Sequence, residues 1–338
     1  MADDLSHSSA AGVYFAPLLP WQARAWQQLT GQYHERHLPH GLLAAGQQGI
    51  GKRAFVWRFV AYLLCHHRSD DGACGQCQSC QWLKAGTHPD LMVLPESAGV
   101  GADGGEESIK IDDIRQLQEY SQTKGHGVKI IVLDYADTLT IGAANALLKT
   151  LEEPREGIFL LLISDNPARL LPTIKSRVQS LPLAHIEQAQ ALDYLGQFMP
   201  SEQAGLLLAI SDGAVVQAKN LLDAAWFDKR LLWLKTFVAL RTGMRLPTAA
   251  SDYWQKTLSL SDFIGLSRLM LAELWRVYLA LPRLHTDIDT PKLLGDLPIH
   301  QNQLDNLLAV LDDVQLSVRQ NLQEKLAFDK IMLQIATG

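Results

Sequence analysis

The sequence predicts an α/β protein with a parallel β-sheet in its N-terminal part, followed by two parts that contain only helices. Up to about residue 185, short continuous apolar runs alternate with segments of helical periodicity, which is typical of a parallel sheet with helices on both faces. A Gly-rich turn joins the first apolar run to the next helix and has the form of a phosphate-binding loop. Beyond residue 185 the helical pattern continues with no further strand pattern.

Changes in this pattern predict three domains. An α/β domain covers residues 1–185, a small helical domain covers 186–225, and a separate all-helical domain covers 226–338. In the third domain one apolar stripe at helical spacing is expected to belong to the core. It consists of Leu304, Leu307, Leu308, Leu311 and Val314.

The elements follow from the length and periodicity of each apolar segment. Continuous apolar runs of four to seven residues indicate buried parallel strands, and positions repeating at i, i+3 and i+4 indicate helices. The expected strands are 41–45, 90–94, 128–134, 158–164 and 178–183, with helices at 18–30, 53–66, 111–122 and 141–153. A Gly-rich loop is expected at 97–107, and three short helices at 185–198, 201–211 and 214–225.

Composition excludes several classes of protein. The chain has 338 residues, of which 47% are hydrophobic and 20% charged, with a formal net charge of −6. Such an acidic chain does not bind nucleic acid through its overall charge, so a local patch or a partner would have to supply that contact. No apolar run reaches the roughly 18 residues that span a bilayer, and the first residues lack the pattern of a secretory signal. We therefore expect a cytoplasmic protein with no membrane contact.

The segment Gly46-Gln-Gln-Gly-Ile-Gly-Lys52-Arg53 is a phosphate-binding loop that departs from the pattern at its last position. In G-x-x-x-x-G-K-[ST], backbone N–H groups surround the phosphates, the lysine balances their charge and the final hydroxyl holds Mg²⁺. Here Arg53 replaces the hydroxyl, and a guanidinium cannot be a metal ligand. Gly46, Gly49, Gly51 and Lys52 are retained, so weak binding of a nucleotide or phosphate stays open while hydrolysis becomes doubtful.

A second departure concerns the acids that an ATPase needs after a buried strand. An Asp there arranges Mg²⁺, and a following Glu polarises the attacking water. Asp134 occupies the first position, but Tyr135 stands in place of the Glu, and a phenol is a poor base at neutral pH. Asp134 could equally be an ordinary acid capping the next turn.

All four cysteines of the chain fall in one short segment, spaced C-x8-C-x2-C-x2-C. Thiolates two residues apart can share one metal ion, and a chain in a reducing compartment rarely forms disulfides. The alternative, a set of partly buried free thiols, does not explain the clustering. We therefore expect a closed, structural zinc site whose ligands are Cys65, Cys74, Cys77 and Cys80, with His66, His67 and His88 nearby but outside the ligand set.

Three longer motifs carry a resemblance to a known family. They are Ala143-Ala-Asn-Ala-Leu-Leu-Lys-Thr-Leu-Glu-Glu-Pro154, the segment Asp165-Asn-Pro-Ala-Arg-Leu-Leu-Pro-Thr-Ile-Lys-Ser-Arg177, and Gly86-Thr-His-Pro-Asp90 after the cysteines. Together they resemble the bacterial clamp-loader subunits of DNA polymerase III, over residues 41–180. The resemblance implies an AAA+ (P-loop NTPase-like) module, a helical lid and an all-α collar domain, in a ring with gamma or tau and delta subunits. Such a ring places the sliding clamp on primed DNA.

The resemblance also implies a role for one arginine. In the family's Ser-Arg-Cys motif the arginine reaches the ATP of the neighbouring subunit, and the matching residues here are Ser176, Arg177 and Val178. A guanidinium from the next subunit would neutralise charge that develops on the γ-phosphate. The alternative is that Arg177 forms an intramolecular salt bridge at the edge of its domain.

A further departure from ATP-binding relatives lies in the lid, where Val216 stands at the position of an arginine. We therefore expect a subunit of the DNA polymerase III holoenzyme that does not hydrolyse ATP, binds it weakly or not at all, and lends Arg177 to a neighbour. Two alternatives remain. One is an active ATPase of the gamma or tau kind. The other is a zinc-dependent nucleic-acid-binding module, suggested by the cysteine cluster and by Lys84, His88 and Lys110 beyond it.

Overall fold

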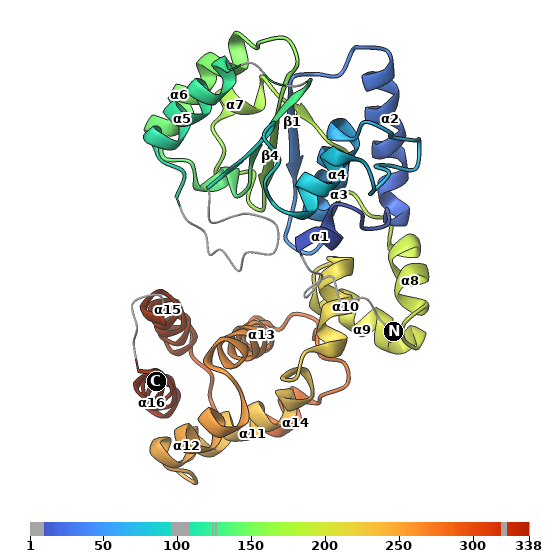
Figure 1. Ribbon diagram of the computed structural model, residues 1–338. Coiled ribbons are helices and arrows are strands. Elements are labelled where there is room, and N and C mark those ends of the chain that lie inside the picture. The colour runs from blue at the N-terminus through green and yellow to red at the C-terminus, as the bar shows by residue number, and fades with distance from the viewer. Residues whose placement is uncertain (1–9, 96–107, 124, 126, 319–322, 338) are drawn as a thin grey trace. The chain divides into compact units, whose positions relative to one another are not determined.

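The computed structural model describes residues 10–95, 108–123, 125, 127–318 and 323–337 (Figure 1). The expected Gly-rich loop at 97–107 lies outside the described residues. The chain divides into two compact units, the first made of residues 1–197 and 214–217, and the second of residues 198–213 and 218–338. The expected domain boundaries at 185 and 225 stay predictions. Within the described residues, no helix is both long and apolar enough to cross a membrane.

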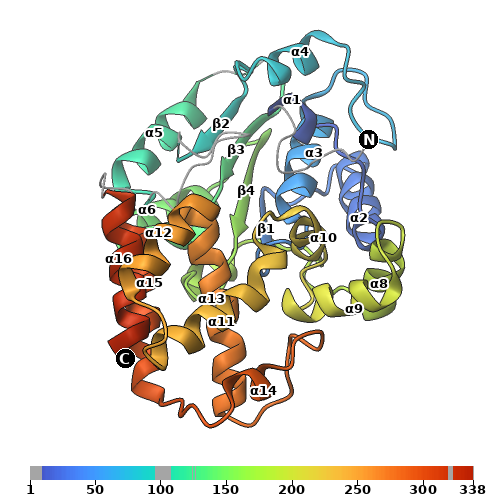
Figure 2. The same cartoon turned by 90° about the horizontal axis from the view of Figure 1, so that it is seen from below.

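The first unit is built on a five-stranded parallel sheet, which confirms the predicted fold class. The strand order is β2-β3-β4-β1-β5, as Figure 2 shows for the first four strands. Because β1, β3 and β4 are neighbours in parallel register, their C-terminal ends lie together at one edge of the sheet. The strands are β1 Gly41–Ala45, β2 Leu91–Leu94, β3 Lys129–Leu133, β4 Ile158–Ser164 and β5 Gln179–Ser180.

Helices cover both faces of the sheet (Figure 1). Side chains of a strand alternate between its two faces, so Ile130 and Val132 of β3 pack with α2 and α3, while Ile131 and Leu133 pack with α5 and α6. The helices are α1 Ala10–Val13, α2 Ala23–His34, α3 Lys52–Leu64, α4 Gln78–Lys84, α5 Ile111–Gln122, α6 Ile141–Glu152, α7 Pro172–Lys175 and α8 Gln188–Gly196, with short 3₁₀ turns at Pro20–Gln22 and Ala136–Thr138.

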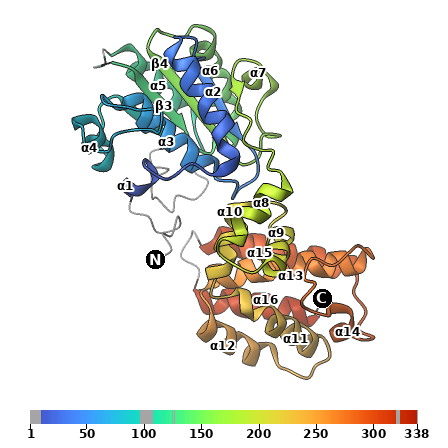
Figure 3. The same cartoon turned by 90° about the vertical axis from the view of Figure 1, so that its right-hand side faces the viewer.

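The second unit is helical throughout its described residues (Figure 3). Its core contains the fully buried Trp233, Trp254, Phe263 and Phe328. The apolar stripe on α15 belongs to this core except at Leu308, which is 39% exposed because it lies at the edge of the buried helix face. The helices are α9 Ser201–Ile210, α10 Val215–Asp223, which begins in the first unit, α11 Arg230–Arg241, α12 Pro247–Thr257, α13 Leu260–Tyr278, α14 Thr290–Leu294, α15 Gln301–Val318 and α16 Glu324–Thr337, with a 3₁₀ turn at Phe227–Lys229.

A buried polar network ties the connection between α13 and α14 to the rest of the second unit. Arg230 of α11 donates to His285 Nδ1 at 2.7 Å and pairs with Asp287 at 2.7 Å. The fully buried carboxylate of Glu273 accepts a hydrogen bond from the backbone N–H of Leu284 at 2.9 Å, and another from the Thr290 hydroxyl at 3.3 Å. Burial, followed by the charge of Arg230, lowers the pKa of His285 to about 4.

This network predicts that the second unit loses stability on mild acidification. The unfolded chain takes up the His285 proton near pH 6.5 and the folded chain only near pH 4, so stability falls as the pH drops through this window. The free energy of unfolding should fall by about 2 kcal/mol between pH 7 and pH 5. Urea unfolding of His285→Gln, which keeps an acceptor for Arg230 but cannot take up the proton, should show a shallower slope. An unchanged slope would contradict this account.

Candidate functional site

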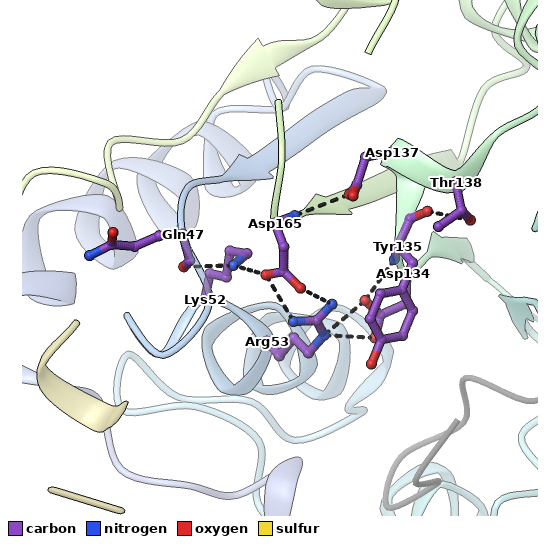
Figure 4. Close-up of polar contacts among 8 residues, drawn as sticks. All are labelled: Gln47, Lys52, Arg53, Asp134, Tyr135, Asp137, Thr138 and Asp165. Carbon is purple, nitrogen blue, oxygen red and sulfur yellow. Dashed lines mark hydrogen bonds and ion pairs between the residues drawn. The ribbon is translucent and has the colours of Figure 1, made fainter. Parts of the chain in front are cut away.

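The phosphate-binding loop lies where three neighbouring strands end. The loop follows β1, Asp134 follows β3, and Asp165 follows β4. Because these strands are adjacent and parallel, the two carboxylates come to the start of α3 although they are far apart in the sequence (Figure 4). The structure therefore brings together the predicted loop residues and Asp134, and it adds Asp165.

The predicted glycines shape the loop. Gly49 and Gly51 have φ angles of 83° and 86°, in the left-handed region that side chains disfavour. Space is also short, because a Cβ on Gly51 would overlap Leu19 and one on Gly49 would lie 2.5 Å from Gln217 Cβ. The loop thus has both the backbone conformation and the close approach that its sequence requires.

Both cations of the loop are paired with carboxylates of the same chain. Lys52 forms an ion pair with Asp165, and its Nζ donates to the Gln47 carbonyl at 2.9 Å. Arg53 lies between the two acids, with Nε 2.9 Å from Asp134 Oδ1 and Nη2 2.8 Å from Asp165 Oδ2 (Figure 4). Lys52 and Asp134 are almost completely buried, at 2% and 4% side-chain exposure. We call these four residues the charge cluster.

The charge cluster is electrically balanced. Burial favours the neutral acid and raises the pKa of Asp134, whereas hydrogen bonds and charge from Arg53 and Lys52 outweigh burial at Asp165 and lower its pKa. Burial alone would lower the pKa of Arg53, but the two carboxylates raise it, so the guanidinium stays charged. It also lies over the ring of Tyr135, 4.3 Å from the centroid. The positive charge that a phosphate would need is already engaged inside the chain.

Other segments of the first unit hold the carbonyl groups of the loop. The backbone N–H groups of Val216 and Gln217 donate to the Gly49 carbonyl at 2.8 and 3.2 Å. Trp21 Nε1 donates to the Ile50 carbonyl at 3.1 Å, and Gln22 Nε2 donates to the Gly51 carbonyl at 3.0 Å. Val216, the expected lid position, therefore touches the loop through its backbone and brings no cation to it.

Arg177 lies apart from the charge cluster, just after α7. Its Nη2 is 2.5 Å from Glu152 Oε1 at the end of α6, and its Nη1 donates to the Thr173 carbonyl at 3.0 Å and to Ser176 Oγ at 3.3 Å. The intramolecular salt bridge considered from the sequence is therefore present. Both of its side chains are at least one third exposed, and such pairs contribute only about 0–1 kcal/mol, so another partner can displace Glu152.

The four cysteines form a compact cluster beside α3 and α4. Their Sγ atoms all lie within 4.8 Å of one another, and the four shorter separations run from 3.5 to 4.0 Å. Backbone N–H groups of His67 and Cys74 donate to Cys65 Sγ at 3.3 Å. Burial raises the pKa of Cys77, but hydrogen bonds, first from the backbone N–H groups of Cys80 and His66, outweigh it and lower the pKa to about 6. The cluster could hold a metal ion.

Two features of the site were not predicted. Asp165 appeared in a family motif without a role, although it follows a buried strand as Asp134 does. That shared position could have indicated it. Helix α4, which carries Cys80, was not predicted because its seven residues lie in a cysteine- and glycine-rich segment with little helical periodicity.

Comparisons with known proteins identify the family. A family model described as DNA polymerase III, delta subunit, matches residues 21–187. The DNA polymerase III subunit delta-prime of Escherichia coli K12 is 30% identical, over 87% of this chain and 86% of that protein. This chain belongs to the delta-prime family. The motifs resembled the clamp-loader subunits of DNA polymerase III, and the comparisons confirm that resemblance.

Further comparisons cover another delta-prime subunit and two proteins described as other subunits. The delta-prime subunit of Pseudomonas aeruginosa is 42% identical over 61% of this chain, and the match spans 62% of that protein. A DNA polymerase III subunit tau of Bacillus subtilis is 26% identical over 61% of this chain and 38% of its own length. Among solved structures, a gamma subunit-related protein of Thermotoga maritima is 18% identical, covers 91% of this chain and 98% of its own, and has a TM-score of 0.42.

The charge cluster predicts a large cost for removing its central cation. Arg53→Met should lower the free energy of unfolding by about 3 kcal/mol, because the buried Asp134 carboxyl would be left without its cationic partner. Adding Asp134→Asn should restore part of this loss, and Arg169→Met, at an exposed arginine of the same unit, should cost less than about 0.5 kcal/mol. Denaturant unfolding measures all three. Equal losses in the single and double variants would contradict the pairing.

Proposed function

We propose that this chain is a clamp-loader subunit that does not hydrolyse ATP and that acts as a fixed component of the ring. The observation that carries the proposal is the position of Arg53, which pairs with Asp134 and Asp165 at the place in the loop where a hydroxyl would hold Mg²⁺. A metal ion beside a guanidinium would meet charge repulsion. Nucleotide binding is therefore weak or absent, since phosphates would also have to displace Asp165 from Lys52.

In this proposal the subunit contributes to catalysis at a neighbouring site. Its partners are gamma or tau and delta subunits, and the assembly loads the sliding clamp onto primed DNA as part of the DNA polymerase III holoenzyme. Arg177 supports this role because it is exposed, next to Ser176, and held by a weak surface pair. Exchanging Glu152 for a γ-phosphate would replace one anionic partner with a more highly charged one.

The arginine role has a direct test in the reconstituted complex. Arg177→Ala should remove the hydrolysis at the one site that it completes, so total clamp- and DNA-stimulated ATP turnover falls by the share of that site. Lys175→Ala, which removes an exposed cation at the end of α7, two residues before Arg177, should leave turnover unchanged. Steady-state phosphate release measures both. Unchanged turnover with Arg177→Ala would exclude the finger, and brisk turnover by the purified chain alone would exclude the non-hydrolysing role.

The cysteine cluster is proposed to be a structural zinc site. A tetrahedral ion with bonds of about 2.3 Å to sulfur has sulfur atoms about 3.8 Å apart, and the four shorter Sγ separations lie close to this value. Four thiolates would complete the coordination and leave no open position for water. Zinc would therefore hold the module of residues 65–80 together and take no part in catalysis.

Metal analysis tests the zinc assignment separately from the ring function. Protein purified without chelator should contain one zinc per chain. Cys77→Ser should lose the metal and increase proteolysis within residues 65–84, while the sheet stays folded, because the module is an insertion between α3 and β2. His66→Ala, at an exposed residue beside the cluster, should keep the metal. A metal-free wild-type chain would contradict the assignment.

A further inference from the structure

A buried hydroxyl links the two halves of the cysteine cluster. Ser79 lies between Cys77 and Cys80 and is fully buried. Its Oγ is 2.7 Å from the carbonyl oxygen of Leu64, the residue before Cys65, and 2.8 Å from His88 Nε2. One side chain therefore contacts both Leu64, the last residue of α3 and the neighbour of Cys65, and the histidine that leads to β2.

The direction of each hydrogen bond follows from the chemistry of the partners. The Leu64 carbonyl can only accept, so the Ser79 hydroxyl donates its single proton there. Ser79 Oγ must then accept from His88, which places a proton on Nε2. Nδ1 of the same ring accepts from the backbone N–H of Asp90 at 3.1 Å. His88 is thus held as the neutral Nε2–H tautomer, with a defined partner for each ring nitrogen.

Asp90 connects this relay to the edge of the sheet. It directly precedes β2, and its carbonyl accepts from the Ile130 N–H at 2.9 Å, so it already belongs to the ladder with β3. The strand β2 is at the edge of the sheet and pairs with β3 on one side. At the other end of the same ladder, the Leu94 carbonyl accepts from the Asp134 N–H at 2.9 Å.

The geometry points to Ser79 and His88 as positioning residues that transmit metal occupancy of the cysteine cluster to the edge strand β2. The inference rests on the zinc part of the proposed function. With metal bound, the cysteines fix Ser79, which orients His88, and His88 holds the Asp90 amide at the start of β2. Simple packing of the His88 ring against Trp82, with centroids 5.7 Å apart, would stabilise the module without such transmission.

Two substitutions separate the arms of the relay. His88→Gln keeps a donor that can reach Ser79 but loses the acceptor for Asp90, whereas His88→Asn keeps that acceptor and loses the donor. Ser79→Ala removes the hydroxyl that joins the Leu64 carbonyl to His88. His67→Gln changes an exposed histidine two residues after Cys65 and serves as the control. Zinc content is measured first for every full-length variant.

The readout is amide hydrogen exchange at Asp90 and in β2, with zinc bound and after its removal by a chelator. In the wild type and His67→Gln, removal should speed exchange by at least about fivefold, as expected for the loss of one buried hydrogen bond. In His88→Gln, His88→Asn and Ser79→Ala, the ratio of the exchange rate without zinc to the rate with zinc should approach one, because the link is already broken.

The outcomes distinguish transmission from packing. If the three relay variants exchange faster in both metal states but keep the wild-type ratio, His88 and Ser79 only stabilise the module and the inference fails. A wild-type chain that contains zinc but shows no response in β2 also overturns it, while leaving the zinc site intact. Absence of zinc from the wild type would overturn the zinc assignment and this inference together.

Discussion

The arrangement of the first unit depends on the Arg53 guanidinium, which bridges carboxylates from the ends of two different strands. Asp134 and Asp165 both lie near the start of α3, and without cations between them two adjacent carboxylates would repel in a poorly solvated site. Arg53 satisfies both through different nitrogen atoms, and Lys52 completes the balance. On the proposed function, the side chain that replaces the Mg²⁺-binding hydroxyl thus also neutralises the carboxylates at the C-terminal ends of the strands.

On the proposed function, this balance explains how a phosphate-binding loop can keep its shape without binding a nucleotide. The N-terminus of a helix and the loop lysine favour an anion, and Asp165 supplies one permanently from within the chain. The carbonyls of Gly49, Ile50 and Gly51 are likewise satisfied by groups from residues 21–22 and 216–217. The loop therefore keeps its backbone shape because its own protein now provides the contacts.

The sequence was sufficient to predict a site when all of its residues lie in one short segment. The glycines and Lys52 define the loop through backbone conformation and charge, and the spacing of the cysteines places four thiols near one point. Asp165, the Ser79–His88 relay and the exposure of Leu308 depend on which strands and helices become neighbours. Periodicity gives the type of an element but not its partners. The position of Asp165 after a buried strand could have marked it as a candidate, but its pairing with Lys52 and Arg53, the relay and the exposure of Leu308 could not be predicted from periodicity.

The charge cluster and the cysteine cluster lie near opposite ends of the strands in the same sheet. One joins the ends of β1, β3 and β4, and the other lies next to the start of the edge strand β2. A ligand changes a conformational equilibrium only by its difference in affinity for the two states, so a unit that binds no nucleotide cannot be switched by one. On the proposed function, this is the useful property. In a ring whose other subunits respond to ATP, a member with internally satisfied charges offers a constant surface and a constantly placed arginine.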